Sequence, residues 1–103
     1  MMAEIPTTLR ATRAGEALRA VDGLERRLDG EHLPRRPEWD CRTCAQRGTP
    51  WPCEPARAAL TKAYGENRSG LAMYVGGLLV LAIAEMPTAS TADLYERFVA
   101  WTR

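Results

Sequence analysis

Apolar residues recur at steps of three and four along the first part of the chain, with arginines and acidic residues between them. These apolar positions are Ala14, Ala17, Leu18, Val21, Leu24 and Leu28. Because this spacing places them on one face of a helix, the sequence predicts an amphipathic helix over residues 7–29. Thr7 or Thr8 is suited to cap its start, and Gly30 is suited to end it.

The second half of the chain predicts three more helices, separated by glycine, proline and serine. The first of them carries Pro55 in its first turn and ends at Gly65. The second is almost wholly apolar, with Ser69 placed as its cap and Pro87 just after its end. The third opens with Ser90, followed three residues later by an aspartate, which resembles a capping box.

The longest uncharged run extends from Ser69 to Ala84. Crossing a bilayer takes about 20 apolar residues, which is more than this run contains, and Gly76 and Gly77 interrupt it. We therefore interpret the run as the most buried helix of the core. The glycines favour a close helix crossing, with a kink as the rival interpretation. The predicted core joins Leu78, Leu79, Leu81 and Ile83 to Leu18, Val21 and Leu24 on one side and to Leu94, Phe98 and Trp101 on the other.

Between the first and second helices, residues 31–53 show no periodic apolar pattern and contain several prolines. Proline restricts its own backbone and that of the preceding residue, so this segment is predicted to be irregular. Irregular stretches of this length are uncommon in compact domains unless something else holds them. All three cysteines and the sole histidine of the chain fall here.

These four residues have spacing typical of a zinc site. Cys41 and Cys44 form a C-x2-C pair, and His32 and Cys53 flank it at equal distances along the chain. Two sulfurs from one tight turn can bind the same ion, and the flanking residues complete a tetrahedron. The sequence therefore predicts a structural Zn²⁺ site made of three cysteines and one histidine.

Several alternatives remain open at this point. Asp40, Glu38 or water are alternatives to His32 as the fourth ligand, and a histidine-ligated iron–sulfur cluster is the alternative cofactor. Cys53 is also suited to be a small buried hydrophobe. A thioredoxin-like role for the C-x2-C pair would need a strand-loop-helix setting that the prolines disfavour.

The two tryptophans of the loop, Trp39 and Trp51, each precede a predicted ligand by two residues. They are expected to shield the thiolates and attach the loop to the helices, or alternatively to form an exposed anchor for a partner. Nearby arginines are candidates to donate hydrogen bonds to the sulfurs, or are simply solvated. These are Arg35, Arg36, Arg42, Arg47 and Arg57.

Length and charge limit the function classes. The 103 residues suit one domain, and 14 basic against 13 acidic residues give a net charge of +1, which disfavours nucleic-acid binding. The start of the chain does not have the pattern of a secretion signal, so a cytoplasmic location is expected. Structural disulfides are rare in the reducing cytosol, which favours metal ligation by the cysteines.

The stretches "HLPRRPEWDCRTC", "PWPCEPAR" and "ADLYERFVAWTR" resemble a group of small uncharacterised actinobacterial proteins, some of which are labelled flavin reductase. The resemblance implies zinc ligation by His32, Cys41, Cys44 and Cys53. This chain departs from the pattern in a longer segment between Cys44 and Trp51. The flavin label has no support here, because the chain carries no glycine-rich phosphate loop and no strand pattern for a flavin-binding barrel.

The sequence as a whole predicts one all-α domain over residues 1–103, with about four helices: residues 7–29, a metal-binding loop over residues 31–53, and three helices within residues 54–103. The leading hypothesis for function is a non-enzymatic interaction, regulatory or pathway-accessory module with a protein partner or a homodimer contact. The alternatives are a metal- or thiol-dependent enzyme or redox carrier, and nucleic-acid binding. The sequence identifies no small-molecule ligand.

Overall fold

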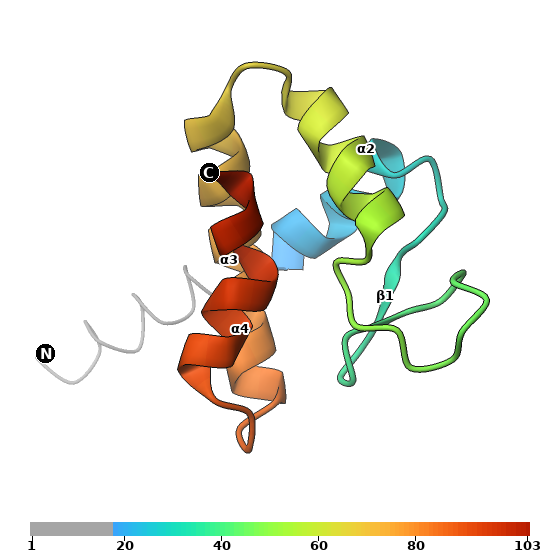
Figure 1. Cartoon of the computed structure of the whole chain (residues 1–103), viewed down its shortest axis with the longest axis vertical. Coiled ribbons are helices and arrows are strands. Elements are labelled where there is room, and N and C mark those ends of the chain that lie inside the picture. The colour runs from blue at the N-terminus through green and yellow to red at the C-terminus, as the bar shows by residue number, and fades with distance from the viewer. Residues whose placement is uncertain (1–17) are drawn as a thin grey trace, which may run out of the picture.

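The computed structural model describes residues 18–103, and most of this part of the chain is helical (Figure 1). The first helix covers residues 18–27. It is followed by α2 (Glu54–Tyr64), α3 (Arg68–Glu85), α4 (Thr91–Phe98) and the short 3₁₀ helix η1 (Ala100–Thr102). The predicted fold of about four helices, with a loop between the first and second, is confirmed in outline. The predicted start of the first helix lies outside the described residues.

The loop itself is not wholly irregular, and this part of the prediction is wrong. Strand β1 (Pro34–Arg35) pairs antiparallel with β2 (Asp40–Cys41), with Pro34 opposite Cys41 and Arg35 opposite Asp40. The proline is tolerated because β1 lies at the edge of a two-stranded sheet, where one backbone donor is not needed. The guanidinium of Arg35 also binds the carboxylate of Asp40 through two hydrogen bonds, of 3.3 and 2.6 Å.

Local signals set most helix ends, with one difference from the prediction. The N-cap of α3 is Asn67, whose side chain accepts a hydrogen bond of 3.0 Å from the backbone N–H of Gly70. Ser69, predicted as the cap, lies inside the helix. Asparagine and serine are about equally good caps, so sequence alone did not separate them. In α4 the predicted cap is confirmed, because Ser90 accepts from the backbone N–H of Asp93 at 3.3 Å, which is one of the two hydrogen bonds of a capping box.

Helix α3 is the central element and packs against α2, α4 and η1. Its buried positions are Leu71, Val75, Leu78 and Ala82, which share one side of the helix. The predicted core residues Leu24, Leu78, Leu94 and Phe98 are buried. The prediction is wrong for Leu18 and Ile83, whose side chains are 47% and 37% exposed.

The rest of α3 is less covered than predicted. A Cβ built on Gly76 or Gly77 would meet nothing within 4 Å, so among the described residues the glycines do not mark a close helix crossing. Nearby Met73 and Val80 are 79% and 56% exposed. By length and composition alone, α3 would be able to span a membrane. A uniformly apolar helix carries no periodic signal that tells which side is buried, which explains the error.

Aromatic and cationic contacts attach the first helix to the helices beside it. The hydroxyl of Tyr74 donates to the backbone carbonyl of Ala20, and burial raises the pKa of Tyr74 to about 12. The guanidinium of Arg27 lies 4.3 Å from the centre of the Tyr74 ring and 5.7 Å from that of Tyr64. The first helix is therefore joined to both α2 and α3 through these two tyrosines.

The cap of α3 gives a direct test of the fold. Asn67→Ala should lower the free energy of unfolding by roughly 1 kcal/mol, because it removes the acceptor for a helix N-terminal donor. Ser69→Ala is the matched control and should change it by less than about 0.5 kcal/mol. Urea unfolding followed by circular dichroism measures both. A larger loss for the Ser69 variant would contradict the assignment of Asn67.

Candidate metal centre

The structure brings together all four residues that the sequence predicted as ligands. The side-chain donor atoms of His32, Cys41, Cys44 and Cys53 lie within 4.8 Å of one another. The Nδ1 atom of His32 is 3.3 Å from the sulfur of Cys41, 3.5 Å from that of Cys53 and 3.6 Å from that of Cys44. In a tetrahedral site with Zn–S of about 2.3 Å and Zn–N of about 2.0 Å, this separation would be about 3.5 Å. The arrangement is therefore compatible with metal binding.

The C-x2-C turn directs backbone donors at one sulfur. The N–H groups of Thr43 and Cys44 each lie 3.4 Å from the sulfur of Cys41. Burial raises the pKa of Cys41, but these N–H groups, together with hydrogen bonds from the side chains of His32 and Cys44, outweigh it and lower the pKa to about 7. This thiol is therefore prepared to act as a thiolate ligand.

The other two thiols behave differently. Burial raises the pKa of Cys53 to about 12 and also raises the pKa of Cys44. Three thiolates this close together would repel one another, so the cluster needs a cation to deprotonate all of them. A divalent metal supplies that charge, since a coordinating thiol loses its proton.

His32 is held in its position by contacts to distant parts of the loop. Its backbone N–H donates to the Thr43 hydroxyl at 3.0 Å, and its carbonyl accepts from the indole N–H of Trp51 at 2.7 Å. Its φ of 54° is unusual for a residue other than glycine. Such a conformation persists where the surroundings determine it, as they do at functional sites.

The two loop tryptophans are fully buried, so their interpretation as an exposed anchor is wrong. Trp39 and Trp51 form an aromatic cluster with Phe98 of α4, with ring centres 5.3 to 5.9 Å apart. Edge and tilted contacts of this kind are favourable beyond the apolar area that they bury. The interpretation that the tryptophans attach the loop to the helices is confirmed.

Sequence reasoning missed Arg97 of α4, which binds the backbone of both tryptophans. Its Nε donates to the carbonyl of Trp51 at 2.7 Å, and its Nη2 donates to the carbonyl of Trp39. Burial lowers the pKa of this guanidinium, and the Asp40 carboxylate opposes that effect. The only sequence signal was a charged residue next to Phe98 on the buried side of a short helix.

Glu85, the last residue of α3, was also missed. Its carboxylate accepts a hydrogen bond of 2.8 Å from the indole N–H of Trp39 and pairs with the guanidinium of Arg36. The Arg36 hydrogen bond holds the pKa of Glu85 below its usual value. Trp39 is thus fixed by α3 through its side chain and by α4 through its carbonyl.

The loop arginines do not serve the sulfurs directly. Arg35 binds Asp40, Arg36 binds Glu85, and Arg57 donates to the carbonyl of Pro52 at 3.0 Å. Arg42 and Arg47 are exposed. Asp40, which was an alternative fourth ligand, pairs with Arg35 and does not belong to the cluster of His32 and the three cysteines. Within residues 18–103 the sulfur of Cys41 receives its N–H donors from the backbone, not from arginine.

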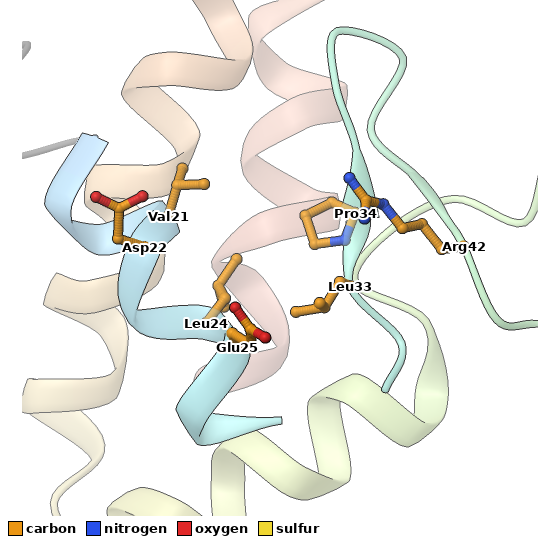
Figure 2. A pocket seen from close by; sticks show the side chains of 7 residues that line it. All are labelled: Val21, Asp22, Leu24, Glu25, Leu33, Pro34 and Arg42. Atoms are coloured by element: carbon orange, nitrogen blue, oxygen red, sulfur yellow. The ribbon is translucent and has the colours of Figure 1, made fainter. Parts of the chain in front are cut away.

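A groove with a volume of about 340 Å³ lies between the first helix and the metal loop (Figure 2). Figure 2 shows Leu24 and Leu33 facing each other across it, with Glu25 beside them. The lining residues are Val21, Asp22, Leu24, Glu25, Leu33, Pro34 and Arg42. The two acidic residues and Arg42 form no ion pair with any described residue.

No protein-family model, curated protein or solved structure matches this chain. The resemblance to the small actinobacterial proteins therefore stays a prediction.

The role of Arg97 can be tested by substitution. Arg97→Met keeps much of the side-chain volume but removes the side-chain donor of the Trp51 carbonyl, while the Trp39 carbonyl keeps the backbone N–H of Trp51. The free energy of unfolding should therefore fall by roughly 2 kcal/mol. Arg47→Met, at an exposed position where the side chain makes no hydrogen bond with any described residue, should change it by less than about 0.5 kcal/mol. Denaturant unfolding of metal-loaded protein measures both. A loss below about 1 kcal/mol for Arg97→Met would contradict this role.

Proposed function

We propose that this protein binds one zinc ion through His32, Cys41, Cys44 and Cys53, and that the zinc is structural. The observation that carries the proposal is the nearly equal separation of His32 Nδ1 from the three sulfurs, at 3.3 to 3.6 Å. One nitrogen and three sulfurs in a tetrahedral arrangement suit zinc. An ordinary iron–sulfur cluster would use a fourth cysteine, which the chain lacks.

A structural role fits this site better than a catalytic one. Catalytic zinc sites use three protein ligands and keep a fourth position for water or substrate, whereas here four donors from the chain fill the tetrahedron. Cys41 and Cys53 are also buried, at 2% and 5% exposure. In closed sites of this kind the free energy of metal binding contributes directly to folding. The loop, with two-residue strands, depends on such a contribution.

The function served by this zinc-stabilised fold is, in our proposal, binding of a protein partner in the groove of Figure 2. Two residues that line the groove are next to predicted zinc ligands in the sequence: Leu33 follows His32, and Arg42 follows Cys41. The zinc would therefore fix the shape of the groove. Its apolar floor and its excess of acidic rim charge suit a partner segment with an apolar side chain beside a basic one.

The metal proposal predicts a specific stoichiometry. Elemental analysis and native mass spectrometry of untagged protein should find one zinc per chain and no sulfide. Chelation should remove the zinc and most of the ordered near-ultraviolet signal of the tryptophans, because Trp39 and Trp51 each lie two residues from a ligand.

Substitutions separate the ligands from their neighbours. His32→Ala, Cys41→Ser and Cys53→Ser should each weaken zinc affinity by about tenfold or more and lower stability. Gln46→Ala, in the same loop but outside the cluster, should leave both unchanged. Iron with sulfide, or a folded His32→Ala protein with unchanged zinc affinity, would contradict the proposed site.

The partner proposal is tested by reversing the rim charge. Immobilised zinc-loaded protein should retain a partner from an extract of the source cells, and Asp22→Lys combined with Glu25→Lys should lose it. Glu96→Lys combined with Glu66→Lys makes the same change of charge at exposed positions outside the groove and should retain it. Equal capture by both double variants would contradict a role for the groove, without affecting the metal proposal.

A further inference from the structure

One side of α3 is apolar and exposed, and we call it the outer face of α3. It consists of Met73, Gly76, Gly77, Val80, Ile83 and Ala84. These positions recur at steps of three and four, so they form one stripe along the helix. The side chains of Met73, Val80 and Ile83 are 79%, 56% and 37% exposed. Soluble proteins rarely leave a continuous apolar stripe open to water unless it serves an interaction.

The outer face has no charge with which to select a partner of opposite charge. No residue from Ser69 to Ala84 is charged. The charged residues at the two ends of α3 are engaged elsewhere. Arg68 donates to the carbonyls of Thr102 and Arg103, and Glu85 pairs with Arg36. Two copies of an uncharged stripe can therefore meet without repulsion between like charges.

The same contacts argue against insertion of α3 into a bilayer. The helix holds the loop at Glu85 and the last residues of the chain at Arg68, and its other side packs against α2 and α4. Spanning a membrane would require breaking these contacts and exposing the buried tryptophans. Association of two copies leaves all of them intact.

We propose that two copies of this chain associate through the outer face of α3, with the two helices crossing at Gly76 and Gly77. A Cβ at either glycine would meet nothing within 4 Å among the described residues, so a second backbone has room to approach closely. Small residues at a crossing permit this approach. Met73 and Val80 lie one turn to either side of the glycines, so a two-fold axis between the helices places Met73 of each copy near Val80 of the other.

The size of the face sets the expected strength. The outer face has four exposed side chains and two glycines. The largest apolar patch of an ordinary monomer covers roughly 300–600 Å², and we expect the outer face to fall in this range. Two such patches would bury on the order of 1,000 Å², at the low end for a specific interface. We therefore expect a weak dimer whose population depends on concentration.

Sedimentation equilibrium of the full zinc-loaded chain, from roughly 1 μM to 1 mM, tests the proposal. The wild type should shift from monomer to dimer across this range. Val80→Glu should weaken dimerisation by about tenfold or more, because it places a charge in the interface. Ala58→Glu, which adds the same charge at an exposed position of α2, should leave it unchanged.

A second variant keeps the test valid if Val80→Glu does not fold. Gly76→Ala combined with Gly77→Ala adds methyl groups where the crossing is closest, so it should weaken the dimer severalfold. The same change should raise the thermal stability of the monomer, since alanine favours helix more than glycine does. Loss of dimer in this variant is then not explained by unfolding.

Three outcomes would overturn the proposal. The first is a monomer at every concentration. The second is a dimer that both variants leave unchanged. The third is flotation of the monomer with phosphatidylcholine and phosphatidylglycerol vesicles, abolished by Val80→Glu, which would assign the face to a lipid surface. None of these outcomes depends on whether the groove binds a partner.

Discussion

The arrangement of the metal loop depends on one guanidinium that binds two backbone carbonyls. Arg97 donates to the carbonyls of Trp39 and Trp51, and so attaches to α4 two segments of the loop that are also joined by the backbone hydrogen bond from Trp51 to Trp39. Each tryptophan lies two residues before a cysteine of the cluster, Cys41 or Cys53. Fixing the tryptophan backbones therefore places two of the four donors, and the C-x2-C turn carries the third. A guanidinium suits this task because its donors diverge in a fixed plane.

The aromatic cluster and the four predicted metal ligands lie close together on the same short segments of the loop, so each helps to order the other. A chain of this size builds only a modest core, and two-residue strands contribute little to stability by themselves. The tryptophans supply buried apolar area against Phe98, while the indole N–H of Trp51 holds the carbonyl of His32. This hydrogen bond helps to hold the backbone of His32 beside the three sulfurs.

The sequence predicted features whose signals lie within a few residues of one another, and it missed contacts between segments that are distant in sequence. The spacing of His32 and the cysteines predicted the cluster, and the caps at Ser90 and Gly65 predicted helix ends, because each signal lies within a few residues. Arg97 and Glu85 contact residues some 46 to 58 positions away, and nothing nearby in sequence marks that distance. The burial of α3 was misjudged for a different reason, since a helix that is apolar all round shows no preferred side.

Helix α3 links these parts of the molecule. Its inner side forms the core, its last residue receives Trp39 and Arg36, and its first residue holds the final carbonyls of the chain. Both ends make contacts within the chain, and the side with Leu71, Val75 and Leu78 is buried in the core, so the outer face is turned away from the core. The exposed stripe is therefore a fixed consequence of how the loop and the C-terminus are attached. A fixed apolar surface of this kind is rigid before it binds, which lowers the entropy cost of association.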